Sequence, residues 1–366
     1  MTDVTIVSAT ALNSGGIGRV TYNWARELAE RGRAVRVLCS SADGVDTEGF
    51  ETVTFSPGRF SYYWKDLYYS LKVRLCANLE GEVLSWLGLG TFLDVDHVHM
   101  GSVPQGLQRE RLARGGVESS DVDLRKRVDD ACFSLYNFHQ REVRRSPSVI
   151  VPSPEIKRTI DRYGPSAPEK TTVVPHGVSE AFVQRTDGED RDQVLFVGGT
   201  MPRKGISTLL SAWAAYEGPE TLLIVGYGDA DSFDSLRSTH GVDPNRVEYL
   251  GFVDDDRLLE LYRTSKAFVL PSFEEGFGIP VIEALAAGTP VVCSNAVGSR
   301  FILEECDGGT IFPAGDPEAL REAIETLFAD ESGRRQAGEA GRAHVASNYL
   351  WRHVVADLDD ALFESS

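Results

Sequence analysis

The sequence lacks a hydrophobic run long enough to cross a membrane. Its 366 residues contain no apolar stretch of eighteen or more, whereas a spanning helix needs about 20 apolar residues. The apolar start MTDVTIVSAT has no basic segment before it, which favours a first β-strand over a signal peptide. We therefore expect a cytoplasmic protein, with peripheral attachment to the inner face of the cell membrane as the alternative.

Cysteine is scarce, and no two cysteines have the CxxC spacing that marks zinc and redox sites. The five are dispersed along the chain: Cys39, Cys76, Cys132, Cys293 and Cys306. We expect reduced and mostly buried thiols. Three aspartates, Asp254 to Asp256, are another candidate for metal binding, but Asp is also preferred at helix N-caps. Because a helical pattern follows, we expect them to cap that helix, and we predict no metal site.

Lysine is also scarce, and the chain has no excess of positive charge. Of 37 basic residues only seven are Lys, and 55 acidic residues give a formal net charge of −18. An acidic surface repels the phosphate backbone, so nucleic acid is excluded as a general partner. Many acidic residues with little lysine are typical of proteins from salt-loving organisms, where screening weakens self-repulsion. This is a hypothesis about habitat and not about the reaction.

Strand-like and helix-like segments alternate along the chain. The first series is a strand at 4–9, a helix at 21–32 and a strand at 34–39. A second series starts with VLFVGG at 194–199 and continues to PVVC at 290–293. Such alternation indicates parallel sheets covered by helices on both faces. The sequence therefore predicts an α/β protein with two Rossmann-like, doubly wound parallel-sheet domains.

The domain boundaries follow from composition. The polar and acidic stretch before the second series has no clear period and suits a surface linker. The last twenty residues have apolar side chains at helical spacing. We predict an N-terminal domain over 1–180, a linker over 181–192, a second domain over 193–346 and a terminal helix over 347–366.

The most informative motif is LPSFEEGFGIPVIEALAAGTPVV (270–292), which indicates a strand, a Gly-rich loop, a helix and a strand. Pro280 suits the first helical turn and Gly288 the helix end. A helix N-terminus at the carboxyl end of a parallel strand binds phosphates through its unpaired N–H groups. The residues expected to present these groups to a diphosphate are Gly276, Phe277, Gly278 and Ile279.

Two carboxylates flank this phosphate site with E-x7-E spacing. Glu275 lies in the loop, and we place Glu283 in the first helical turn. Ionised carboxylates accept hydrogen bonds, and sugars and ribose offer hydroxyl donors. The alternative is two ordinary acidic residues at a strand–helix junction.

A second motif, VLFVGGTMPRKGISTLLSAW (194–213), places Arg203 and Lys204 just before a helix at the end of a strand. Two cations at a helix N-terminus form a strong anion site, and Arg can bind an anion bidentately. The alternative is a solvated turn.

These two motifs together resemble the signature of retaining glycosyltransferases of family 4, the glycosyl transferases group 1. The resemblance covers nearly the whole chain, is strongest over 194–346 and is weak over 40–150. It implies the GT-B architecture, in which an acceptor-side N-terminal domain and a nucleotide-sugar-binding C-terminal domain face a cleft. In that architecture the C-terminal helix returns towards the N-domain.

The resemblance also implies a role for each residue. Glu275 meets the donor sugar, Glu283 holds the ribose hydroxyls, and Arg203 with Lys204 contacts the donor diphosphate. Some family members have a further Arg after the strand, where this chain has Gly199, so only the basic pair is carried over. The implied reaction moves a sugar from a UDP- or GDP-linked donor to a glycan or lipid-phosphate-linked acceptor, with retention and without cofactor or metal.

A third motif, ATALNSGGIGRVTYNWARELAERG (9–32), predicts a Gly-rich loop between a strand and a helix. Glycines allow close backbone approach to a ligand, and the family resemblance places Gly15, Gly16 and Arg19 near acceptor or donor phosphates. The dinucleotide fingerprint is absent because Thr21 stands where its third glycine is needed. A simple tight turn is the alternative.

Two histidines close the predicted strand VDHVHMGS, at His97 and His99. Related enzymes often carry a histidine near the donor sugar, so His99, nearer the strand end, is our catalytic candidate. A structural histidine is the alternative, and we favour that interpretation for His176.

The segment 58–75 is basic and aromatic in an acidic chain. Such a helix suits a membrane interface or an acceptor with a lipid phosphate; packed aromatics at a cleft edge are the alternative. For the whole protein the alternatives are a GT-B-fold nucleotide-sugar epimerase or phosphorylase, or an inactive nucleotide-sugar-binding subunit.

Overall fold

The structure, a computed structural model, describes residues 2–12, 15–56, 62–86, 93, 95–100, 143, 145–163, 171–184 and 191–363. The described residues form two compact units. One contains the described residues up to Gly177 together with those from Trp351 onward, and the other contains the described residues of Val178–Leu350. The two-domain prediction is confirmed.

The described part of the first unit contains a seven-stranded sheet in which all neighbouring strands are parallel. In spatial order its strands are β3 (Glu51–Thr54), β2 (Val35–Cys39), β1 (Val4–Val7), β4 (Glu82–Trp86), β5 (His97–His99), β6 (Ser148–Val151) and β7 (Thr171–Val173). The chain runs outward from β1 to β3 and then returns to β4 on the other side of β1. Ligands of such sheets bind outside the carboxyl ends of the strands at this switch point.

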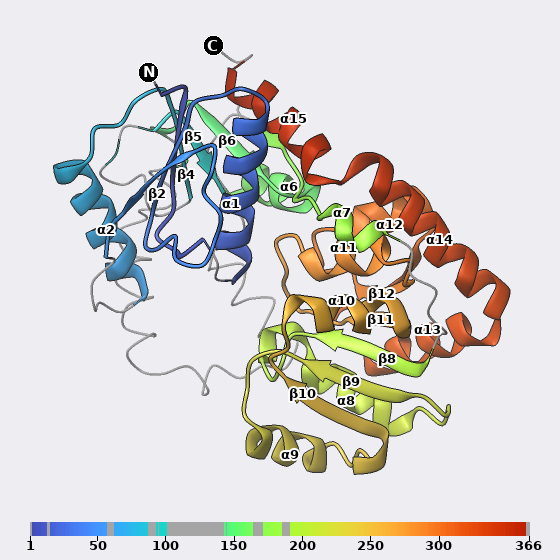
Figure 1. Cartoon of the computed structure of the whole chain (residues 1–366). Helices are drawn as coiled ribbons and strands as arrows, with labels where there is room; N and C mark the ends of the chain where they lie inside the picture. The colour runs from blue at the N-terminus through green and yellow to red at the C-terminus, as the bar shows by residue number, and fades with distance from the viewer. Residues whose placement is uncertain are drawn as a thin grey trace. The chain divides into compact units, whose positions relative to one another are not determined.

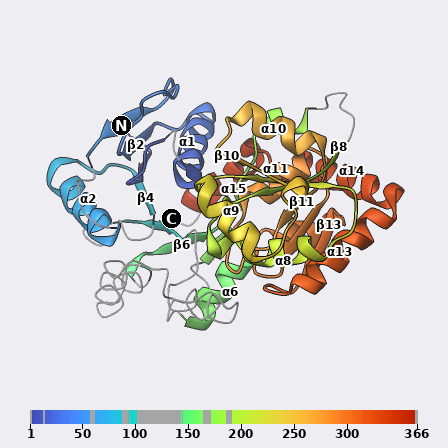
Figure 2. The same ribbon diagram turned by 90° about the horizontal axis from the view of Figure 1, so that it is seen from below.

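Helices cover both faces of this sheet. They are α1 (Gly15–Glu30), α2 (Tyr62–Cys76), α6 (Pro154–Tyr163) and the terminal α15 (Trp351–Phe363). Figures 1 and 2 show α1 and α2 on opposite sides of the strands. Helix α1 buries Val20, Trp24 and Leu28, whose i, i+4, i+8 spacing makes one apolar face.

The terminal helix belongs to the first unit, although it follows the second in sequence. Helix α15 packs against α1, and Arg33 donates two hydrogen bonds to the carboxylate of Asp359, at 2.8 and 3.2 Å. A bidentate Arg–carboxylate pair is among the stronger polar contacts of proteins. The predicted return of the C-terminal helix to the N-terminal domain is confirmed.

The second unit contains a parallel sheet of six strands among its described residues. In spatial order they are β10 (Val247–Gly251), β9 (Thr221–Val225), β8 (Arg191–Val197), β11 (Ser265–Leu270), β12 (Val291–Ser294) and β13 (Gly309–Phe312). The order reverses between β8 and β11, so the loops after these two strands meet at the switch point.

Helices connect the strands of the second unit. They are α7 (Glu180–Val183), η4 (Pro202–Lys204), α8 (Ile206–Ala215), α9 (Ala230–Thr239), η5 (Pro244–Arg246), α10 (Asp255–Thr264), α11 (Ile279–Ala286), α12 (Arg300–Cys306), α13 (Pro317–Ala329) and α14 (Glu331–Asn348). Helices α10 and α11 lie on one side of the sheet and α8 on the other (Figure 1). Phe268, Val269 and Leu270 in the central β11 are fully buried, because both faces of the sheet are covered.

The observed boundaries differ from the predicted ones. The division between the units falls at Gly177 and Val178, before the predicted linker 181–192, and α7 lies partly within that linker. Helix α7 packs against α11 and α14, which joins the segment to the second unit. The predicted terminal helix 347–366 is split at Tyr349–Leu350, between α14 and α15.

Candidate functional site

The loop after β8 is held in place by one glycine. Gly205 adopts a left-handed φ of 78°, and a Cβ added there would lie 1.9 Å from the carbonyl oxygen of Pro271. The N–H of Phe273 also donates to the carbonyl of Arg203 at 2.9 Å. These contacts join the η4 turn to the carboxyl end of β11, so Arg203 and Lys204 lie at the switch point of the sheet.

The loop after β11 is fixed by backbone hydrogen bonds to the turn that follows β12. The N–H of Glu275 donates to the carbonyl of Ala296 at 3.2 Å, and the N–H of Gly298 donates to the carbonyl of Glu275 at 2.9 Å. Gly278, with a left-handed φ of 96°, is the N-cap of helix α11, and Pro280 lies in its first turn. The strand, Gly-rich loop and helix predicted over 270–292 are therefore confirmed.

Three charged side chains meet between these loops. The Lys204 ammonium contacts Glu275 Oε2, and Arg203 Nη1 lies 3.5 Å from the same oxygen. The exposed fractions of the Lys204, Glu275 and Arg203 side chains are 10%, 15% and 39%. Two cations and one carboxylate leave a formal charge of +1 at the carboxyl edge of a parallel sheet. Such a site attracts an anion, and partial burial strengthens the attraction.

Glu283 lies in the same motif but contacts a residue of another helix. Its side chain is 4% exposed, and Oε2 accepts a hydrogen bond from the Tyr262 hydroxyl at 3.0 Å. Its predicted place in the first helical turn is wrong. Helix α11 begins at Ile279, so a helix of 3.6 residues per turn places Glu283 in the second turn.

The predicted glycine loop of the first unit is shorter than expected. Helix α1 begins at Gly15, so Gly15 and Gly16 open the helix and do not belong to the loop before it. Residues 13 and 14 lie outside the described residues. Gly18 is required by space, since a Cβ there would lie 2.1 Å from the carbonyl oxygen of Ala11. Arg19 is half-buried on α1, and a phosphate role for these residues stays a prediction.

His99 is fully buried at the end of β5. Its ring centroid lies 4.3 Å from that of Trp86, 5.0 Å from that of Trp24 and 5.6 Å from that of His176. Burial lowers the pKa of His99 well below its usual value, and the neighbouring His176 lowers it further. A neutral, enclosed imidazole is typical of a packed histidine, and the catalytic role of His99 stays a prediction.

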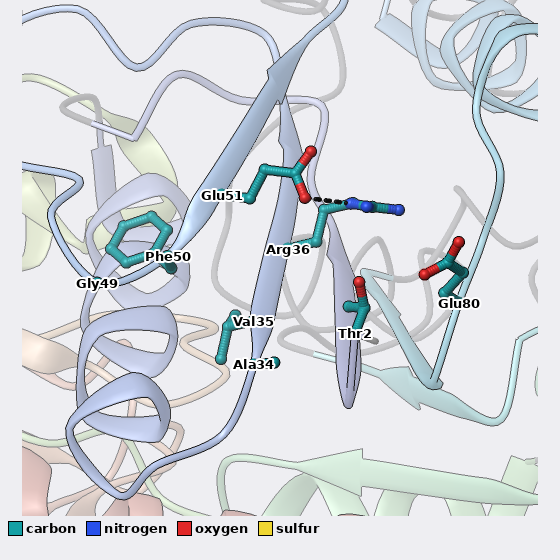
Figure 3. A pocket seen from close by; sticks show the side chains of 8 residues that line it. All are labelled: Thr2, Ala34, Val35, Arg36, Gly49, Phe50, Glu51 and Glu80. Atoms are coloured by element: carbon teal, nitrogen blue, oxygen red, sulfur yellow. Dashed lines mark hydrogen bonds and ion pairs between the residues drawn. The ribbon is translucent and has the colours of Figure 1, made fainter.

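A hollow of about 430 Å³ lies at another edge of the first unit (Figure 3). It is lined by Thr2, Arg36, Glu51 and Glu80, among others, and Arg36 Nε donates to Glu51 Oε2 at 2.7 Å across it. These residues stand at or just before the amino ends of β1 to β4. Ligands of parallel sheets bind at the carboxyl ends, so this hollow is not the predicted site.

Known proteins resemble the chain over most of its length. The family model described as glycosyl transferases group 1 matches residues 178–344. A phosphatidyl-myo-inositol mannosyltransferase of Mycolicibacterium smegmatis is 30% identical over 293 residues, covering 76% of this chain and 72% of the relative. The chain belongs to the glycosyl transferases group 1 family.

Solved structures show the same fold. Sucrose-phosphate synthase from Thermosynechococcus elongatus matches with a TM-score of 0.79 and 22% identity, and each chain is fully covered. HepE from Anabaena, solved with UDP-glucose, matches with a TM-score of 0.75 and 17% identity, again over 100% of both chains. The protein is a glycosyltransferase with the GT-B fold, as predicted. The family assignment favours transfer over an epimerase, a phosphorylase or an inactive subunit.

Sequence reasoning marked Glu283 as a candidate site residue but missed its partner. Tyr262 stands in an ordinary helical pattern, and no local signal marks it as the partner of Glu283, 21 residues away.

The prediction that the three aspartates cap a helix is confirmed. Asp254 is the N-cap of α10, and its side chain accepts a hydrogen bond from the N–H of Arg257 at 2.8 Å.

Proposed function

We propose that this glycosyltransferase moves a hexose from a UDP- or GDP-linked donor to a lipid-linked or glycan acceptor, with retention and without a metal ion. The contact of Lys204 and Arg203 with Glu275 carries the proposal. The two cations bind the donor diphosphate. The Glu275 carboxylate orients them and accepts a hydrogen bond from a hydroxyl of the donor sugar. Glu283 accepts hydrogen bonds from the ribose hydroxyls and is positioned by Tyr262.

Charge on the leaving diphosphate grows as the bond to the sugar breaks. Groups that are already oriented towards that charge stabilise the transition state most, because they need no reorganisation. Lys204 and Arg203 are held by Glu275 and by backbone contacts at the end of β11. These cations supply the electrostatic assistance that a divalent metal supplies elsewhere.

The mannosyltransferase relative is named for a phosphatidylinositol acceptor, and the surface of α2 supports a lipid-linked acceptor here. Tyr68, Leu71 and Leu75 follow i, i+3, i+7 spacing and are 38%, 40% and 75% exposed. Lys72 and Arg74 flank them. The segment 57–61 lies outside the described residues. An exposed apolar face with flanking cations suits an anionic lipid surface, and no described helix is long and apolar enough to span a membrane.

Two measurements test the proposal. The protein is incubated in EDTA with GDP-mannose or UDP-glucose and a bacterial lipid extract, and products are analysed by mass spectrometry. We expect a lipid that has gained one hexose in the presence of EDTA. Activity that appears only after magnesium or manganese is added contradicts the metal-free reaction, and release of free sugar without a glycosylated product contradicts the acceptor class.

Flotation with vesicles tests the membrane contact. Binding to vesicles of phosphatidylglycerol should exceed binding to neutral phosphatidylcholine vesicles, and Leu71→Ser with Leu75→Ser should reduce it. The control is Tyr227→Ser, which removes a 69% exposed side chain from the second unit. Equal flotation of both variants removes α2 from the proposal.

A further inference from the structure

Two aromatic side chains of the second unit are exposed side by side. Tyr227 is 69% exposed and Phe252 is 70% exposed, whereas most described large apolar side chains are buried. Their rings are stacked, with centroids 5.5 Å apart and planes inclined by 29°. Exposed apolar groups that gather in one place mark binding surfaces more often than single exposed residues do.

Both rings lie at the ligand-binding edge of the six-stranded sheet. Tyr227 follows β9 and Phe252 follows β10, so each stands just beyond the carboxyl end of a parallel strand. The two turns are joined because the N–H of Gly226 donates to the carbonyl of Gly251 at 2.8 Å. The pair is thus held by the sheet itself and does not depend on a long loop.

The same turn is attached to the loop that carries the cations. The N–H of Thr200 donates to the carbonyl of Tyr227 at 3.1 Å. A Cβ added to Gly199 would lie 2.0 Å from that carbonyl oxygen, so close approach of the two loops requires glycine there. Arg203 follows three residues after Thr200. Aromatic surface and positive charge are therefore fixed within one rigid set of turns in one unit.

A nucleoside diphosphate presents a matching pair of groups, a base with a flat π-face and a charged diphosphate. Aromatic side chains stack on any base, because every base has such a face. We propose that Tyr227 and Phe252 form a platform on which the nucleobase of the donor stacks, while Arg203 and Lys204 bind its diphosphate. This inference rests on the proposed donor class and assigns two residues that no motif of the sequence marked.

Calorimetry on the full chain tests the platform with three probes: GDP, UDP and inorganic pyrophosphate. Tyr227→Ala and Phe252→Ala should each lower the affinity for the nucleotide about tenfold, which is about 1.4 kcal/mol. The nucleotide is the one, GDP or UDP, that the wild type binds. Affinity for pyrophosphate should not change, because it has no base. Arg203→Ala should lower the affinity for pyrophosphate as well as for the nucleotide.

Two variants separate stacking from simple apolar contact. Phe252→Tyr keeps the ring and should bind nucleotide like the wild type, whereas Phe252→Leu keeps apolar volume and should behave like Phe252→Ala. Arg335→Ala, with a 60% exposed side chain on α14 of the same unit, is the matched surface control. Wild-type nucleotide affinity in both alanine variants overturns the platform. A wild type that binds neither GDP nor UDP overturns the proposed donor class instead.

Discussion

Replacement of Lys204 by methionine tests the charged cluster most directly. The side chain keeps most of its volume but loses the ammonium that contacts Glu275. A hydrogen bond to a charged group contributes about 1.5 to 3 kcal/mol. Since Arg203 Nη1 still lies 3.5 Å from the same carboxylate oxygen, we expect a loss of unfolding free energy near the lower end, about 1.5 kcal/mol.

The effect on catalysis should be larger than the effect on stability. Removal of one preorganised group that stabilises transition-state charge typically costs about 10² to 10³ in rate, or about 2.7 to 4 kcal/mol. We therefore expect Lys204→Met to lower single-turnover transfer by about that factor, with a smaller loss of donor affinity. The assay combines calorimetry of donor binding, single-turnover kinetics and urea unfolding.

Lys266 provides a matched control in the same unit. Its ammonium lies 2.6 Å from Asp192 Oδ1 and 3.0 Å from Glu220 Oε1, and its side chain is 23% exposed. It stands near the amino end of β11, away from the candidate site. Lys266→Met should destabilise the fold but leave turnover of the folded enzyme unchanged.

A double variant separates the charge pair from catalysis. Glu275→Gln introduced together with Lys204→Met should recover part of the lost stability, because a neutral amide replaces a mostly buried carboxylate, but it should not restore transfer. The reasoning is refuted if folded Lys204→Met turns over at the wild-type rate. Equal losses of donor affinity and rate would assign Lys204 to ground-state binding alone.

Three further predictions follow from other features. Glu283→Gln should weaken binding of the nucleoside diphosphate by about 1.5 to 3 kcal/mol with the fold intact, and wild-type affinity by calorimetry would refute the ribose assignment. The melting temperature should rise between about 0.1 M and about 2 M KCl, because salt screens repulsion in a chain of net charge −18; equal stability at both salt concentrations leaves the habitat hypothesis unsupported. Burial holds the pKa of His99 below its unfolded value near 6.5, so only the unfolded chain takes up this proton below that pH. The contribution of neutral His99 to the unfolding free energy is therefore fully present above pH 6.5. Below that pH the unfolding free energy falls by about 1.4 kcal/mol per pH unit for this one histidine. Urea unfolding should show a shallower pH dependence in His99→Phe, and an equal slope would contradict the assignment.

Local patterns were enough to predict the architecture. A strand and a helix each have their own period of apolar residues, so the βαβ order could be predicted from neighbouring residues alone. The position of α11 followed from Pro280 in its first turn and Gly288 after its end, and Asp254 marked the start of α10. These signals depend on backbone preferences and caps that act within a few residues.

Boundaries were less predictable because contacts across the chain decide them. The polar segment 181–192 resembles a linker by composition, but α7 inside it packs on α11 and α14. Packing of α7 on these two helices outweighs the local preference of the segment.

The sequence by itself determined the two doubly wound domains, a terminal helical segment with an apolar face and the identity of the charged residues at the strand ends, and the family resemblance added the return of the terminal helix. Only the tertiary structure decided which of these residues meet. Lys204 and Glu275 are 71 residues apart and become partners because β8 and β11 are adjacent in the sheet. The stacking of Tyr227 on Phe252 likewise depends on β9 lying beside β10. Residue identity and periodicity are local properties, whereas these contacts depend on strand order, which long-range packing sets.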